Sequence, residues 1–348
     1  MRKVLLASTA LFALGSVSAM AADITISGGF ELGYDSEADQ SDGTRITSET
    51  DWNVKFSNTT DSGITTSLNY GFDESGGVDD QNYSIAGPFG TIAVANASDG
   101  DDGAVDAMDV EADTVAENSV WASHTSGYTT AYAGGWSASL GTGDRISYTL
   151  PSIMEGLTVA VQHLNEAGDE SFAYGASMQM GAVKVVGAKM AGTTAAVAGV
   201  AAVAENGTGN GVTGVAAANK MEVEGTHMGL SASVSGLTLE YGLNNYERTE
   251  IATAGGAETT REGKGTRIGA SYAVGDITLG YEDVAAEWDA SATETVDTYK
   301  YTSIGAAYPV ATGITAKLAV TDGEIYSATA TNNKNEYSTT RLSVSVAF

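Results

Sequence analysis

The 348-residue chain has no cysteine and only three prolines. The absence of cysteine excludes the small secreted modules that are held together by disulfide bonds. Proline cannot donate to a β ladder, so its scarcity favours a continuous hydrogen-bonded sheet. No uninterrupted apolar run has the length of a membrane helix. The nearest stretch, residues 191–218, consists mainly of Ala and Gly and contains Glu205, so we expect a loop there.

Basic residues are also scarce, with 16 Lys and Arg against 44 Asp and Glu. Two of the bases, Arg2 and Lys3, lie in a leader that we expect to be removed, which leaves 14 bases and a net charge of −30. A chain so acidic repels nucleic acid, which we therefore do not expect as a partner. Acidity can also accompany disorder, but hydrophobic residues make up 43% of the chain and alternate with polar ones, which favours a fold.

The first 21 residues have the three parts of a secretory signal peptide. A basic start at Arg2 and Lys3 precedes an apolar run from Val4 to Val17, and an A-x-A site follows at 19–21. We therefore expect residues 1–21 to be removed and residues 22–348 to form a single domain.

Period-2 alternation recurs from Ile24 to Phe348 and predicts sixteen strands. Their connections alternate between two lengths. Seven are short turns, and eight are longer loops at 35–44, 73–80, 97–143, 164–170, 191–221, 244–264, 283–298 and 321–336. Alternating turns and loops are typical of an outer-membrane β-barrel, whereas a β-sandwich would lack this pattern. The fold class we predict is an all-β, antiparallel transmembrane barrel.

The chain ends on a regularly alternating strand, YSTTRLSVSVAF at 337–348. Leu342, Val344 and Phe348 share one face, and Arg341 lies on the other. Termini are usually frayed, but the last strand of a closed barrel pairs with the first and faces lipid. The Tyr and Phe residues near strand ends fit the membrane–water boundary: Tyr34, Phe72, Tyr241, Tyr272, Tyr281 and Phe348.

Three stretches resemble the Gram-negative general porins, in particular the alphaproteobacterial branch. They are the final strand, RISYTLPSIMEGLTVAVQHL at 145–164, and GPFGTIAVANASDG at 87–100. The resemblance covers nearly all of residues 22–348. It implies a sixteen-stranded barrel in the bacterial outer membrane, usually a homotrimer among lipid and lipopolysaccharide, with the third long loop folded into the lumen. It also implies that the barrel-assembly machinery reads Phe348.

The longest connection, 97–143, occupies the position of that third loop. Eight acids lie in the nineteen residues 99–117, and no base interrupts them: Asp99, Asp101, Asp102, Asp106, Asp109, Glu111, Asp113 and Glu117. A loop this long usually has a function. By the resemblance it would place carboxylates at the narrowest part of a pore, where such groups favour cations. The alternative is a solvated surface loop. Asp99, Asp101 and Asp102 could also hold calcium weakly.

Porins of this family oppose the acidic loop with inward arginines. Strand parity predicts inward bases at Arg45, Lys55, Arg145, Arg267, Lys317 and Arg341, with Lys184 as a further candidate. Of these, Arg45, Lys55, Arg145 and Arg341 are the candidate basic side of a pore constriction. Asn53 stands where the family commonly has an inward arginine on the second strand, which strengthens the expectation of cation preference.

The sequence therefore predicts a passive channel for small hydrophilic solutes and ions, without a chemical step. The alternatives are a substrate-specific channel and a plugged structural or adhesive barrel. A sugar-specific channel would carry a track of inward aromatics, whereas the predicted inward positions are mostly Ser, Thr, Gly and acid. An enzyme is not expected, because the three histidines are scattered, no nucleophile elbow occurs, and no cofactor motif has the required context.

Overall fold

The computed structural model describes residues 23–37, 44–73, 78–97, 103–105, 107–108, 144–166, 169–194, 220–251, 258–288, 297–327 and 333–348. They form sixteen strands, which confirms the predicted number. The strands are β1 (Asp23–Glu37), β2 (Thr44–Thr59), β3 (Thr65–Phe72), β4 (Val78–Gly87), β5 (Gly90–Ala97), β6 (Arg145–Thr149), β7 (Leu157–Glu166), β8 (Asp169–Met180), β9 (Val183–Thr194), β10 (Lys220–Val234), β11 (Leu237–Ile251), β12 (Thr259–Val274), β13 (Ile277–Trp288), β14 (Asp297–Ala311), β15 (Ile314–Ser327) and β16 (Asn333–Ala347).

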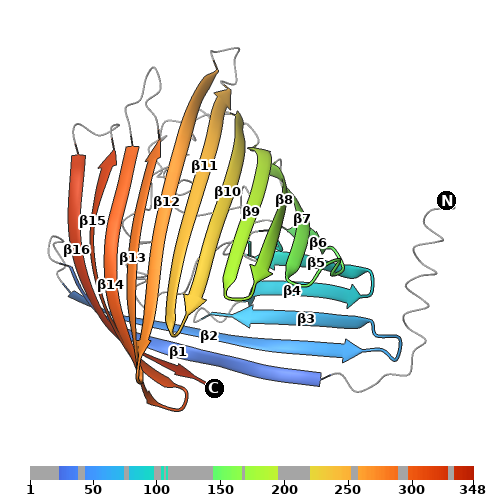
Figure 1. The fold of residues 1–348 in the computed structure, drawn as a ribbon, viewed down its shortest axis with the longest axis horizontal. Coiled ribbons are helices and arrows are strands. Elements are labelled where there is room, and N and C mark those ends of the chain that lie inside the picture. Colours follow the sequence, from blue (N-terminus) through green and yellow to red (C-terminus); the bar gives the residue numbers. More distant parts are fainter. Residues whose placement is uncertain are drawn as a thin grey trace, which may run out of the picture.

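Each strand pairs antiparallel with its neighbours in sequence, and β1 pairs with β16, so the sheet is a closed barrel. Figure 1 shows β9 to β16 side by side, with β1 to β4 running nearly at right angles to them in this view. Tight turns join the strands at one end. Between β10 and β11 the turn has two residues, Ser235 and Gly236, both with positive φ, which matches the right-handed twist of a hairpin. The predicted barrel is thus confirmed.

The outer face is apolar and exposed, as the alternation predicts. Ile24, Leu239 and Leu342 are each more than half exposed. Such a surface is stable only in contact with lipid or another apolar surface. None of the described segments is a helix long and apolar enough to cross a membrane.

Most strands extend further than the apolar pattern predicts, and the corresponding loops are shorter. The loop expected at 244–264 is largely strand, because β11 continues to Ile251 and β12 begins at Thr259. Likewise β4 begins at Val78, inside the loop expected at 73–80. The backbone ladder continues beyond the apolar band, where the outward residues are polar and the hydrophobic alternation ends.

Candidate functional site

The inner face of the barrel carries the predicted bases. Arg45 and Lys55 project inward from β2, Arg145 from β6 and Arg341 from β16, each opposite in parity to the exposed apolar residues of its strand. Arg267 on β12 and Lys317 on β15 also face inward. The strand registers therefore agree with the predicted inward direction, and a role of these bases in a constriction stays a prediction.

Two inward arginines were missed by the sequence analysis. Arg248 on β11 and Arg261 on β12 are directly paired in register and buried, with 5% and 3% exposure. Both fall within 244–264, where the sequence predicts a loop. The parity of Asn244, Tyr246 and Arg248 continues the inward set of β11 and is the signal that could have identified Arg248.

An ionic network crosses the seam between the first and last strands. Asp35 of β1 is directly opposite Arg341 of β16 and Arg45 of β2. Its carboxylate accepts a hydrogen bond from Arg45 Nε at 3.2 Å and lies 3.8 Å from Arg341 Nε. Arg341 Nη2 also donates to Glu31 Oε1 at 2.5 Å, and Lys317 Nζ lies 3.7 Å from Glu31 Oε2. Three of the predicted wall bases are therefore paired with carboxylates of β1.

A large part of the opposite inner wall is apolar, which corrects the expectation of a mainly polar and acidic inner face. Mostly small and medium side chains of β7 to β13, with one tyrosine, form a buried cluster there: Ala160, Ala173, Val186, Ala188, Met190, Val223, Tyr246, Val284 and Ala286. Val105 and Met108, from the segment 97–143, complete this cluster and are 0% and 4% exposed. The described part of the long segment thus lies inside the barrel, against this wall.

Close packing holds this short segment in place. Val105 N donates to Gln162 Oε1 of β7 at 3.0 Å. Within the turn, Ala107 N donates to Gly103 O and Met108 N donates to Val105 O. A Cβ at Gly103 would overlap Gln162 Oε1, and one at Gly175 would lie 2.7 Å from Met108 Sδ. Both glycines therefore allow an approach that a larger residue would block.

The eight predicted constriction acids lie outside the described residues: Asp99, Asp101, Asp102, Asp106, Asp109, Glu111, Asp113 and Glu117. Their assignment, and the weak calcium site at Asp99, Asp101 and Asp102, stay predictions. In the described part of the chain, no group of three or more His, Cys, Asp or Glu residues could hold a metal ion.

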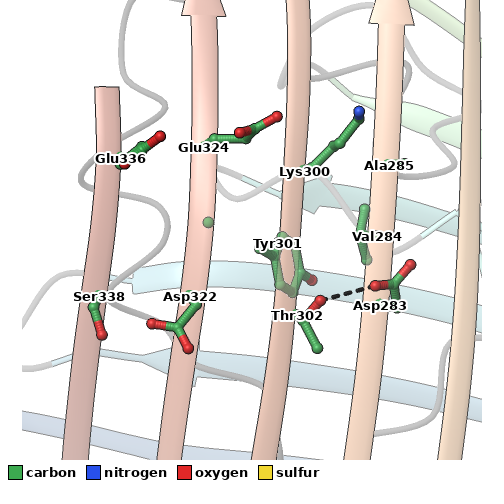
Figure 2. A pocket seen from close by; sticks show the side chains of 11 residues that line it. Asp283, Val284, Ala285, Lys300, Tyr301, Thr302, Asp322, Glu324, Glu336 and Ser338 are labelled. Carbon is green, nitrogen blue, oxygen red and sulfur yellow. Dashed lines mark hydrogen bonds between the residues drawn. The ribbon is translucent and has the colours of Figure 1, made fainter. Parts of the chain in front are cut away.

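A surface groove of about 500 Å³ lies outside the lumen. Figure 2 shows its side chains on four adjacent strands, β13 to β16. Asp283, Thr302 and Asp322 follow one another across the ladder with outward parity, and Thr302 Oγ1 donates to Asp283 Oδ2 at 2.8 Å. The groove belongs to a polar collar above the apolar band, together with Lys300 and Glu336.

The C-terminal residue closes the seam at its lower end. Phe348 N donates to Gly28 O at 2.9 Å, and Gly28 N donates to Phe348 O at 3.2 Å. The Phe348 ring is 71% exposed on the outer face. The terminal residue is therefore ordered by the first strand while its aromatic ring stays accessible.

The sequence matches the family of Gram-negative porins over residues 7–346. No curated protein matches the chain. The fold resembles the trimer form of OmpT from Vibrio cholerae, with a TM-score of 0.69 and 11% identity over 94% of this chain and all of that one.

Two other solved structures share the fold. A porin refined at 1.8 Å resolution gives a TM-score of 0.64 and 17% identity, covering 94% of this chain and 100% of that one. An anion-selective porin from Comamonas acidovorans gives 0.63 and 11% with the same coverage. These identities are low, so the likeness extends to the fold alone.

Proposed function

The chain belongs to the Gram-negative porin family and forms a β-barrel channel of the outer membrane, and we propose that it passes small hydrophilic solutes and ions by passive diffusion. The observation that carries this proposal is a closed barrel whose inner wall bears charged and amide side chains while a segment of the longest connection lies inside. No chemical step is needed, because the polar wall and the local width select among solutes.

Conductance of the purified protein in planar bilayers tests the proposal. We expect discrete current steps in potassium chloride, with current proportional to salt concentration. A plugged structural or adhesive barrel would give no steps. A substrate-specific channel would show current that one solute blocks at low concentration while related solutes do not.

We further propose that the channel prefers cations. The support is the net charge of the chain and the eight acids of residues 99–117. The fold does not decide the preference, since the Comamonas acidovorans structure with the same fold is of an anion-selective porin.

The reversal potential under a potassium chloride gradient measures this preference. Replacing Asp106, Asp109, Glu111 and Asp113 by Asn or Gln should shift it toward chloride. The matched control replaces four acids of 244–264: Glu247, Glu250, Glu258 and Glu262. Of these, Glu247 and Glu262 are exposed on the outer face of the barrel. Equal shifts in the two variants would contradict a constriction formed by 97–143.

The proposed partners are two further copies of the chain, outer-membrane lipid and lipopolysaccharide. The trimer form of the Vibrio cholerae protein supports a homotrimer. The outer surface supports contact with lipid, since an apolar band lies below a collar rich in carboxylates and lysines.

We also propose that the barrel-assembly machinery recognises Phe348, whose ring is exposed at the seam. Deleting Phe348 removes both backbone hydrogen bonds to Gly28 and the aromatic ring. Phe348→Ala removes the ring alone and is the informative variant. We expect both changes to lower the amount of folded protein in the outer membrane, measured by heat-modifiable mobility on gels. Normal yield from Phe348→Ala would contradict recognition of the ring.

A further inference from the structure

A buried histidine lies on the inner face of β7 to β13, the wall against which Val105 and Met108 pack and which we call the covered wall. His227 of β10 is 2% exposed, and its Nδ1 lies 2.6 Å from Oδ1 of Asn244 on β11, which is 5% exposed. An amide oxygen only accepts hydrogen bonds, so this contact assigns the proton of the neutral imidazole to Nδ1. Passive diffusion gives this buried, titratable side chain no role.

The positions around the imidazole carry no charge. On the adjoining row of register partners, Met190 and Tyr246 pack over Gly225, where a Cβ would lie 2.9 Å from Met190 Cγ and 2.5 Å from the Tyr246 ring. The inward positions that flank His227 on β9, β10 and β11 are all apolar, glycine or amide: Val186, Ala188, Met190, Gly225, Gly229, Gly242, Asn244 and Tyr246.

The same row of register partners carries the contact that holds Met108. His227 is opposite Ala188 of β9, and Ala188 is opposite Gly175 of β8. A Cβ at Gly175 would lie 2.7 Å from Met108 Sδ and 3.1 Å from Ala188 Cβ. Met108 and Ala188 belong to one buried cluster. A charge on His227 would therefore arise at the edge of the packing that anchors residues 103–108.

The charged side chains that face this site are mostly basic. Four bases and one acid lie inward within two rows of His227 on the strands packed beside it: Lys184, Arg248, Arg261, Arg267 and Glu240. Glu282 of β13 lies close to Arg267, with 2.6 Å between Oε1 and Nη2, and so compensates that base first. On the long connection, Asp106 and Asp109 flank the anchoring residues in sequence, and their side chains lie outside the described residues.

We propose that His227 is a pH-sensitive switch that releases residues 103–108 from the covered wall in acid. The proposal rests on the proposed channel function and adds a regulation to it. Histidine changes its charge between about pH 5 and pH 8. The neutral ring suits the apolar surroundings, whereas an imidazolium buried there, near several bases, is unfavourable until water reaches it. Attachment is therefore favoured at neutral pH and weakens as the pH falls.

A spin label in the anchored turn measures the attachment without relying on current. The chain has no cysteine, so Ala107→Cys supplies a single thiol. Ala107 is exposed, between the buried Val105 and Met108. The label should be restricted at about pH 7.5, and its mobile fraction should rise about tenfold by about pH 5, which corresponds to a proton affinity of His227 that differs by one pH unit between the two states.

Two variants at 227 separate this switch from other acid effects. His227→Asn keeps an N–H near the position of Nδ1 but cannot take up a proton, so the label should stay restricted at both pH values. His227→Gln serves the same purpose if the first variant gives a low yield.

The matched control is His163→Gln, which removes an imidazole on the outer face of β7 whose Nδ1 lies 3.1 Å from Ser171 O. It should leave the pH response intact. His124→Gln, in the long connection, should also leave it intact.

A mobile fraction that is equal at both pH values would overturn the switch. A response that survives in both His227 variants would also overturn it, because another group, such as Asp106 or Asp109, would then carry it. Single-channel recording separates this result from the proposed function. We expect the current noise to rise with the mobile fraction. A label that responds to pH in a barrel without current at either pH would overturn the channel and leave the switch standing.

Discussion

The inner faces of β2 and of β7–β13 are built by the same alternation but have opposite environments. On β2, Glu49 and Asp51 are exposed, and Asn53 pairs with Asn69 across to β3. On β7 to β13, the inward positions include a buried apolar cluster that Val105 and Met108 complete. Parity decides only which side chains point inward. Whether they meet water depends on what the rest of the chain places against them.

Side-chain size explains why the segment settles on the second wall. Ala160, Ala173 and Ala188 leave room that Val105 and Met108 fill, and Gly175 allows the closest approach of Met108. Burying two apolar side chains is favourable, whereas the charged wall of β2 offers them no apolar contact. The contacts of Val105 and Met108 with the covered wall therefore anchor the segment, and the wall of β2 is left open to the passage.

Breaking the anchor should have the largest effect. Met108→Asp places a carboxylate in the apolar cluster, which costs several kcal/mol unless the segment leaves the wall. We expect the barrel to persist and the segment to detach, which should change the single-channel current and increase its noise. The measurement is single-channel recording, with heat-modifiable mobility as the check that the barrel folds.

Ala107→Asp is the control for this change, because Ala107 is exposed in the same turn. It adds the same charge one residue away and should leave both current and noise close to those of the unmodified protein. Equal effects of the two variants would mean that added charge, and not loss of the anchor, alters the current.

The ion pairs between β1 and the last two strands should stabilise the folded barrel beside the open wall. Arg341→Met removes a partner of both Glu31 and the fully buried Asp35, and breaking a buried pair typically costs about 3 kcal/mol. We expect a lower temperature for the loss of the folded band on gels. Lys317→Met removes a half-exposed base 3.7 Å from Glu31 and should cost at most about 1 kcal/mol. Similar shifts for both variants would contradict the structural importance of the buried pair.

The sequence predicts the barrel well because each strand repeats one simple pattern. Sixteen strands, the direction of Arg45, Lys55, Arg145 and Arg341, and the closing strand at Phe348 all follow from period 2. The strand ends are less predictable. Above the apolar band the outward residues become polar, as at Glu247 and Glu262, and the hydrophobic signal ends while the backbone ladder continues.

The anchor could not be predicted, because nothing local indicates it. Val105 and Met108 are two of several apolar residues scattered through an acidic stretch without a strand or helix period. Their partners, such as Met190 and Val284, lie far away in the sequence and are brought together only when the barrel closes. The inward acids of β2 were visible in the sequence, but their exposure depends on which wall the segment covers.

The smallest effects on stability are expected from replacing one amide side chain on each wall. Gln162 of the covered wall is 2% exposed and accepts from Val105 N, so Gln162→Leu leaves that buried N–H without this acceptor and should cost about 2 kcal/mol. Asn69→Leu removes the bond to Asn53 on the open wall, where water can replace it, and should cost about 0.5 kcal/mol. Thermal loss of the folded band measures both. If Asn69→Leu were the more damaging change, the wall of β2–β4 would be the covered one, and the passage would have to run elsewhere.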